Sequence, residues 1–249
     1  MHGGSISDEK VAQACCVVAE HAALAKEAGA CAIEVLVTAP GRKTKTARRL
    51  LRELRRTAPA PVRVLSSDEE ATLTFVGAIA STATMARTFV VCDVGGGSTE
   101  LAAGTRSMGA VWTQSFALGS LRLTTTAMQH DPPASSDVAA ARLHAAVALR
   151  DVAFPSLELA LATGGTARTL SKLVGPQLAE TQLNEALTLL SSAPSHVLAA
   201  RFGLEAWRTR TLAAGAAILA EVERALALPL EVVRGGLREG AALALLDQL

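Results

Sequence analysis

One glycine-rich segment, residues 89–101, combines the residue types that bind phosphate. It reads Phe-Val-Val-Cys-Asp-Val-Gly-Gly-Gly-Ser-Thr-Glu-Leu, so an apolar strand ends in Asp93, three glycines turn the chain and Glu100 follows on a return strand. Backbone N–H groups of consecutive glycines can approach an anion because no Cβ stands in the way, and the Ser98 and Thr99 hydroxyls add donors. The segment lacks the lysine of a P-loop and continues into a strand rather than a helix. The sequence therefore predicts a phosphate-binding hairpin; the alternative is an ordinary glycine turn.

The two acids that bracket this turn indicate a divalent cation. A hairpin places Asp93 and Glu100 side by side, and carboxylate oxygens bind Mg²⁺, in part through water. A cation there would neutralise the same phosphate that the glycines bind. We therefore expect Mg²⁺ as the cofactor, with Asp93 and Glu100 as its ligands. Two solvated acids without a metal are the alternative.

Two further Gly-Gly pairs stand where predicted strands run into predicted helices. One lies in Leu161-Ala-Thr-Gly-Gly-Thr-Ala-Arg168 and the other in Val233-Arg-Gly-Gly-Leu-Arg-Glu-Gly240. The free N–H groups of a helix N-terminus favour an anion. Each pair is also typical of an ordinary strand-to-helix turn, in which Thr166 would only cap its helix. Taken separately, the pairs indicate no site.

Glu70 has two interpretations. Ser67 and Glu70 fit the S-x-x-E capping box of a helix that follows a strand, which would make Glu70 structural. A glutamate whose pKa is raised by a partly apolar site can instead act as a general base that activates water. The spacing alone does not decide between the two roles.

Residues 42–56 contain eight cations and a single acid, Glu53. On a helix, Arg48, Arg52 and Arg56 fall four residues apart and form one basic stripe. This stripe is either a solvated surface or a track for a linear polyanion, whose charges it would match. The sequence leaves both interpretations open.

Short β-rich runs alternate with longer Ala/Leu-rich segments, a pattern typical of an α/β protein. Strands are expected at residues 33–38, 62–65, 89–94, 99–103, 111–116, 158–163 and 230–234. Helices are expected at 8–28, 44–57, 68–81, 137–151, 167–173, 179–190, 207–227 and 238–248, the first with Ser7 as N-cap and Gly29 as C-terminal stop. The pattern changes near Arg87. We therefore predict two domains, 1–88 and 89–249, with the C-terminal helix packing back on the first.

The composition excludes several classes of protein. Of 249 residues 50% are hydrophobic and the net charge is +1, so the chain should fold and has no bulk attraction to nucleic acid or anionic membrane. Aromatic residues make up 3%, too few for base-stacking platforms. The apolar stretches fall short of the ~20 residues of a membrane span. The four cysteines show no CxxC spacing, which argues against a zinc site or a disulfide framework and favours the cytoplasm.

Together these motifs resemble the exopolyphosphatase and guanosine pentaphosphate phosphohydrolase (Ppx/GppA) family of the actin-like ATPase superfamily. The resemblance covers nearly the whole chain, through SSDEEATLTFVG (66–77), DVGGGSTEL (93–101), ALGSLRLTT (117–125), ATGGT (162–166) and VVRGGLREG (232–240). It implies a two-domain actin-like (ribonuclease H-like) α/β fold.

The resemblance also implies roles for individual residues. The family's catalytic glutamate falls on Glu70 and its arginine, which would contact the phosphate, on Arg42. Its two phosphate-binding turns and their metal-binding acids fall on Gly95, Gly96, Gly97, Ser98, Thr99, Gly164, Gly165 and Thr166, with Asp93 and Glu100 as the acids.

The beginning of the chain departs from the family pattern. Pro40-Gly41 replaces a helical dipeptide, and Thr46 stands where the family has asparagine. The family begins with a strand hairpin carrying a D-x-G-S/T-N-S loop, and this sequence starts after it, so we expect an N-terminally truncated first domain. Without that half of the phosphate clamp, weak hydrolysis is expected, and an uncovered sheet edge favours a homodimer.

The expected function is a phosphoanhydride hydrolase that releases orthophosphate from the end of polyphosphate or from guanosine pentaphosphate. Polyphosphate or guanosine pentaphosphate would be its partner, with neither nucleic acid nor a membrane. The alternative is a catalytically weak or inactive phosphate-binding or regulatory protein of the same family. A third hypothesis is an ATP-dependent kinase or ATPase of the superfamily. The Glu69-Glu70-Ala71 motif in the predicted helix 68–81 argues against it.

Overall fold

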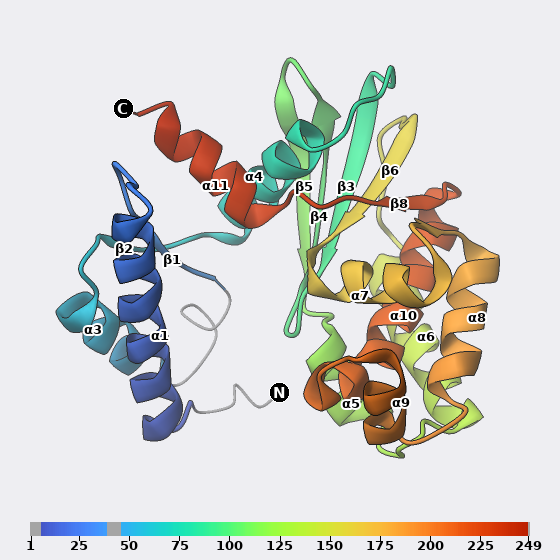
Figure 1. The fold of residues 1–249 in the computed structure, drawn as a ribbon. Helices are drawn as coiled ribbons and strands as arrows, with labels where there is room; N and C mark the ends of the chain where they lie inside the picture. The colour runs from blue at the N-terminus through green and yellow to red at the C-terminus, as the bar shows by residue number, and fades with distance from the viewer. Residues whose placement is uncertain (1–5, 39–45, 249) are drawn as a thin grey trace. The chain divides into compact units, whose positions relative to one another are not determined.

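The structure is a computed structural model of the α/β class that describes residues 6–38 and 46–248 (Figure 1). Its contacts form two compact units, Met1–Glu70 with Leu245–Leu249, and Ala71–Ala244. Both divisions fall inside helices, namely α4 (Ser67–Ala80) and α11 (Leu237–Leu246). The sequence-based boundary near Arg87 lies beyond α4 instead. The observed boundary, between Glu70 and Ala71, precedes the predicted one because most of α4 packs on the sheet of the second unit.

Within residues 6–38 and 46–70, the first unit contains two complete helices and a two-stranded parallel sheet. Its elements are α1 (Asp8–Glu27), β1 (Val35–Val37), α3 (Ala47–Thr57) and β2 (Val62–Val64). Their small core is formed by Val11, Val37, Leu50 and Leu54. Ser7 caps α1 as predicted, because its Oγ accepts a hydrogen bond from the Lys10 amide at 3.3 Å. Of the predicted helix 44–57, Thr44 and Lys45 lie outside the described residues.

The second unit is built on a six-stranded sheet in the order β5-β4-β3-β6-β8-β7. The strands are β3 (Thr88–Val94), β4 (Thr99–Thr105), β5 (Gly109–Phe116), β6 (Leu159–Thr163), β7 (Gln177–Leu178) and β8 (Leu230–Val232). The first three form an antiparallel meander, whereas β6 runs parallel to β3 and β8 parallel to β6. The carboxyl ends of β3, β6 and β8 therefore meet at one edge, the position where open α/β sheets bind ligands.

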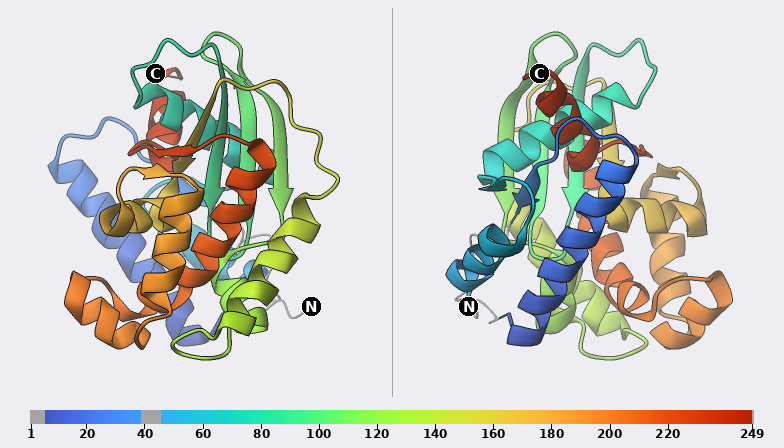
Figure 2. Two further views of the ribbon diagram at one scale, coloured as in Figure 1. Left: turned by 90° about the vertical axis from the view of Figure 1, so that its right-hand side faces the viewer. Right: turned by 60° about the vertical axis from the view of Figure 1, so that its left-hand side comes forward.

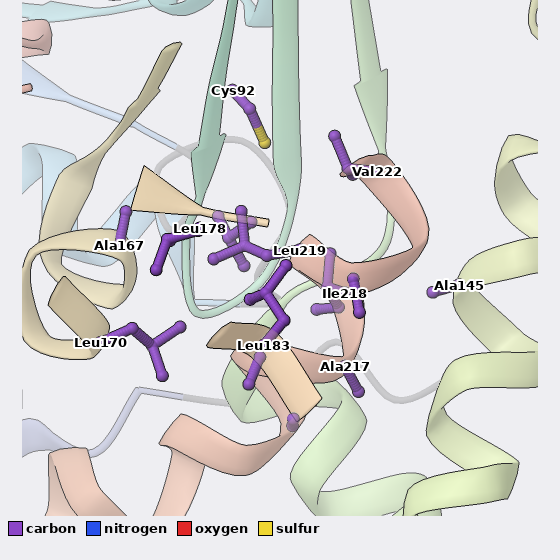
Figure 3. Packing of buried hydrophobic residues seen from close by; sticks show 14 of the residues in the cluster. Cys92, Ala145, Ala167, Leu170, Leu178, Leu183, Ala217, Ile218, Leu219 and Val222 are labelled. Carbon is purple, nitrogen blue, oxygen red and sulfur yellow. The ribbon is translucent and has the colours of Figure 1, made fainter. Parts of the chain in front are cut away.

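Helices cover both faces of this sheet. One face carries α5 (Ser120–Ala127), α6 (Ser135–Leu149), α7 (Gly164–Val174), α8 (Glu180–Leu190), α9 (Ser195–Phe202) and α10 (Ala206–Leu226), of which α6 and α10 lie side by side (Figure 2). In the core on this face, Ile218, Leu219 and Val222 of α10 lie near Leu183 of α8 and Cys92 of β3 (Figure 3). The other face packs against the part of α4 that carries Ala71, Phe75, Ala78 and Ile79.

Helices α4 and α11 cross at glycines. A Cβ on Gly240 would collide with the carbonyl oxygen of Leu73, and one on Gly77 with that of Gly236. Larger residues at Gly77 or Gly240 would force these backbones apart. The two glycines thus place the turn between β8 and α11 next to the carboxyl ends of the strands.

Every predicted strand and helix is present within a few residues of its predicted ends as far as the structure describes them, but three elements of the described residues escaped prediction. These are α5, α9 and β7. Helix α5 has only eight residues, half of them serine or threonine, and these residue types are weak helix formers. Strand β7 has two residues and exists through its pairing with β8. Tertiary contacts rather than local propensity therefore stabilise these elements.

Candidate functional site

A row of four polar residues crosses the sheet of the second unit near the carboxyl end of β3. Asp93 on β3 pairs with Glu100 on β4 and with Thr163 on β6, and Glu100 pairs with Ser115 on β5. Directly opposed residues on neighbouring strands point to the same face of a sheet. The Ser115 hydroxyl donates to Glu100 Oε1 at 3.0 Å, and the Thr163 hydroxyl donates to the Gly235 carbonyl at 2.6 Å. The row therefore presents Asp93 and Glu100 together.

The glycine turn between β3 and β4 is held by its carbonyl groups. The Ser120 and Arg122 amides, at the start of α5, donate to the carbonyls of Gly95 and Gly96 at 2.9 and 3.0 Å. Gly119 is needed for this packing, because a Cβ there would collide with the Gly96 backbone. The short helix α5, which the sequence pattern missed, thus anchors the turn.

The amides of Gly96, Gly97 and Ser98 donate to no protein acceptor within the described part of the chain. Backbone amides left in this way on a glycine turn are suited to bind phosphate oxygens. A Cβ added to Gly97 would meet no atom within 4 Å, so the space beside this residue is open. The arrangement has the properties expected of a phosphate cradle.

The hydroxyl groups of Thr99 and Thr166, next to the two glycine turns, are used in hydrogen bonds between described residues, whereas that of Ser98 is not. Thr99 is fully buried and its hydroxyl donates to the Leu118 carbonyl at 2.6 Å. The Thr166 hydroxyl donates to the Val94 carbonyl at 2.8 Å. Neither of these two hydroxyl groups is therefore available to an anion. Ser98 is 4% exposed, and its hydroxyl has no partner among the described residues.

The second glycine turn lies inside α7 rather than before it. The sequence predicts a helix from Ala167, but α7 begins at Gly164, and Thr163 precedes it without a side-chain cap. Thr166 is therefore not the cap of this helix. The first amides of α7 lack acceptors within the helix and lie at its positive end. Gly164 has φ +82° and packs on Asp93, because a Cβ there would collide with Oδ1 of that carboxylate.

Arginines surround these turns, and the sequence reasoning assigned none of them to the site. A pocket of about 110 Å³ is lined by Asp93 and Gly164 together with Arg168, Arg234 and Arg238. The signal was present, because each of these three arginines lies within three residues of a Gly-Gly pair. Arg208 covers the Gly165 backbone and stacks on the Trp207 ring at 4.7 Å.

The chemistry of the donors at Asp93 and Glu100 fits Mg²⁺. No group of three or more His, Cys, Asp or Glu side chains within residues 6–38 and 46–248 is arranged as a metal site. Mg²⁺ is held in many phosphate-transfer sites by only one or two carboxylates, with waters and phosphate oxygens completing its shell. Two carboxylates on paired strands satisfy that requirement.

Cys92 is next to Asp93 in sequence but takes no part in this chemistry. Burial, together with the charges of Asp93 and Glu100, raises the pKa of the Cys92 thiol well above its ordinary value. A protonated thiol is a poor nucleophile. Cys92 is therefore a core residue.

At the start of α4 the capping box is shifted by one residue from the predicted one. The Ser66 Oγ accepts from the Glu69 amide at 3.1 Å, and the Ser66 amide donates to Glu69 Oε2 at 2.7 Å. These hydrogen bonds, followed by the Arg63 charge, lower the pKa of Glu69. The cap is thus formed by Ser66 and Glu69, not by Ser67 and Glu70. Glu70, half-buried in the first turn, does not have the capping role. Arg42 lies outside the described residues.

The basic stripe lies on the exposed side of α3. Arg52 and Arg56 both bind Glu53, at 3.3 and 3.1 Å, and their hydrogen bonds lower the pKa of that carboxylate. Arg49 pairs with Asp8. Two residues of the stripe are thus neutralised in part by a local acid, which favours the solvated-surface interpretation for them.

Comparison with known proteins assigns the family. A sequence model of the Ppx/GppA phosphatase family matches residues 2–249. Exopolyphosphatase 2 of Mycobacterium tuberculosis is 36% identical over 135 residues, which are 53% of this chain and 41% of that protein. Exopolyphosphatase 1 of Mycobacterium leprae is 28% identical over 261 residues, covering 98% of this chain and 77% of that protein. The match to the first of these relatives spans less than half of its length.

Solved structures of this group share the fold. An exopolyphosphatase from Cytophaga hutchinsonii has a TM-score of 0.87 at 19% identity, over 99% of this chain and 85% of that one. The Aquifex aeolicus member of the Ppx/GppA family has a TM-score of 0.83 at 23% identity, over 98% and 83%. The expected α/β fold of the family is therefore confirmed.

Proposed function

Since this chain belongs to the Ppx/GppA phosphatase family, we propose that it hydrolyses phosphoanhydride bonds and releases orthophosphate from the end of inorganic polyphosphate. The observation that carries the proposal is the turn at Gly96–Ser98, which lies beside two paired carboxylates and whose amides have no acceptor among the described residues. The names of the curated relatives support polyphosphate as substrate. Guanosine pentaphosphate, which ends in the same kind of bond, is the second candidate substrate.

In this mechanism the second unit holds the phosphate. The amides of Gly96, Gly97 and Ser98 donate to the oxygens of the terminal phosphoryl group, where negative charge is concentrated. Asp93 and Glu100 would hold Mg²⁺, which supplies charge neutralisation for the phosphate. The buried Ser98 hydroxyl adds one more donor.

The attacking group in the proposal is a water molecule. Glu70 accepts a proton from this water while the water oxygen bonds to the terminal phosphorus. The bond from that phosphorus to the bridging oxygen breaks. The shortened chain leaves with its electron pair on that oxygen. Arg42 would neutralise the transferred phosphoryl group. Assigning the cap to Glu69 supports the proposal, because Glu70 is then not needed to begin α4.

The proposal is tested by phosphate release from long-chain polyphosphate with Mg²⁺, compared with guanosine pentaphosphate and ATP. We expect polyphosphate to be the best substrate. Asp93→Asn should lower the rate by about a hundredfold or more, as expected when charge stabilisation is removed from a transition state. Asp151→Asn, which removes an exposed acid next to the end of α6, is the matched control and should retain the rate.

Other outcomes assign other functions. Phosphate or polyphosphate binding without release by a folded protein would reject hydrolysis and support the binding or regulatory alternative. Preference for ATP would support the kinase or ATPase reading. The homodimer and the cytoplasmic location stay predictions from the sequence. No helix within the described residues is long and apolar enough to cross a membrane.

A further inference from the structure

Three arginines gather in one pocket of the second unit, and the proposed mechanism uses none of them. Arg168 comes from α7, whereas Arg234 and Arg238 come from the segment that joins β8 to α11. Asp93 and Glu239 bring two negative charges to the same lining, so the pocket carries a net positive charge. Such a pocket attracts small anions.

Arg234 and Arg238 form no ion pair with an acid among the described residues, although Asp93 and Glu239 line the same pocket. Neither guanidinium makes an ion pair or a side-chain hydrogen bond with any described residue, and both residues are exposed. In the same unit Arg142 binds Glu221 at 2.7 Å, which shows how an arginine needed for the fold is paired here. Two unpaired cations in one pocket repel each other, and an anion between them would remove that repulsion.

Arg168 holds Arg234 in position. Its Nε donates to the Gly164 carbonyl at 3.2 Å and its Nη1 to the Arg234 carbonyl at 3.3 Å. The side chain thus joins the start of α7 to the turn after β8. A guanidinium has five N–H donors, so three remain for a ligand.

The two glycine amides of the turn between β8 and α11 are already used by side chains of the protein. The Gly235 amide donates to the Ser81 hydroxyl at 3.0 Å, and the Gly236 amide donates to Glu239 Oε2 at 2.9 Å. These two glycine amides are therefore not available to an anion, in contrast to the amides of Gly96–Ser98. The arginine side chains are the positively charged donors of the pocket. Guanidinium groups bind phosphate by paired hydrogen bonds.

The size of the pocket limits what it can bind. Its volume of about 110 Å³ is well below the several hundred Å³ of sites for nucleoside-sized ligands. The enclosed part of the pocket therefore has room for one phosphate group but not for a nucleoside.

We propose that Arg168, Arg234 and Arg238 form a subsite for one phosphate group, which lies beside Asp93 and Gly164 and does not use the amides of Gly96–Ser98. The identification of the anion as phosphate, which is either the released product or a phosphoryl group of a bound chain, rests on the proposed function. Two phosphate positions within one unit would favour a substrate with consecutive phosphates.

The test measures binding of inorganic phosphate and of pyrophosphate to the full chain by titration calorimetry in EDTA, so that neither Mg²⁺ nor turnover contributes. Arg234→Gln and Arg238→Gln should each weaken phosphate binding about tenfold or more, the effect of one lost charged hydrogen bond. Arg150→Gln is the matched control, because it removes one exposed positive charge at the end of α6. Its affinity should stay within about twofold of the unchanged protein.

Gly97→Ala, which alters the glycine turn, should leave the Arg234-dependent binding in place. Tighter binding of pyrophosphate than of phosphate, lost in Arg234→Gln, would assign the subsite to a bound chain. Equal affinities would assign it to the product. Affinities unchanged in both arginine variants, or no saturable binding by the folded protein, would overturn the subsite. Loss of phosphate binding in Arg234→Gln, in a protein that does not hydrolyse polyphosphate, would reject the proposed function and leave the subsite standing.

Discussion

Adjacent glutamates at the start of α4 have different roles, and replacing each in turn should separate them. Glu69 accepts the Ser66 amide at 2.7 Å and binds Arg63 Nη1 at 2.8 Å, so it closes the capping box. Glu70 is the proposed base. We expect Glu69→Ala to lower stability with little effect on turnover, and Glu70→Gln to lower turnover with little effect on stability.

The expected magnitudes follow from the contacts. Losing a helix cap costs about 0.5–2 kcal/mol. The Arg63 ion pair adds little, because the Glu69 side chain is 47% exposed and solvent screens the attraction. A loss of about 1 kcal/mol lowers the melting temperature of a chain of this length by roughly 2–4 °C. Glu70→Gln keeps the shape of the side chain and the helix propensity, and removes a base worth about a hundredfold or more in rate.

The pH dependence gives a second check on Glu69. Its pKa is lowered in the folded state by the Ser66 amide and hydroxyl, then by Arg63. The stabilisation it supplies is therefore complete above the unfolded pKa, roughly 4.3, and is lost as the pH falls through the lower folded value. The difference in melting temperature between the unchanged protein and Glu69→Ala should shrink at acid pH.

Two measurements together distinguish the roles of Glu69 and Glu70. Circular dichroism gives the melting temperature of each variant, and phosphate release gives its rate. The reasoning is refuted if Glu70→Gln releases phosphate at the unchanged rate. It is equally refuted if Glu69→Ala loses as much turnover as Glu70→Gln, because the two residues would then act as one structural unit.

Three further predictions concern single residues of the second unit. Gly97→Ala adds a methyl group that meets no protein atom, so the melting temperature should hold while phosphate binding at the turn weakens by about tenfold or more; unchanged binding would reject the cradle. Gly240→Ala should lower stability in urea unfolding by about 1–3 kcal/mol, because its Cβ would overlap the Leu73 carbonyl; a neutral effect would contradict the helix crossing. Burial would raise the pKa of Asp137, but hydrogen bonds from His130 and the Ala134 amide lower it, so its stabilisation is lost on acidification and Asp137→Asn should flatten the acid limb of the stability profile.

The local features of the site could be predicted from the sequence. Three consecutive glycines between a buried strand and a return strand define a turn with accessible amides, and the hairpin register then places Asp93 opposite Glu100. These relations involve neighbouring residues, so backbone geometry alone is enough to establish them. The N-cap at Ser7 was predictable for the same reason.

Local patterns were ambiguous where two registers satisfied the same rule. Both Ser66–Glu69 and Ser67–Glu70 match S-x-x-E, and only the position at which β2 ends and α4 begins selects the first. That position depends on the pairing of β2 with β1, whose residues are distant in the sequence.

Tertiary structure alone decided which polar groups are available for a ligand. The Thr166 hydroxyl is used by Val94, and the Thr163 hydroxyl by Gly235, each 72 residues away along the chain. The pocket of Arg168, Arg234 and Arg238 forms because parallel strands bring the ends of β3, β6 and β8 to one edge of the sheet. Sequence patterns report which residue types are present, whereas the donors left over for a phosphate depend on which distant acceptors the fold has already placed beside them.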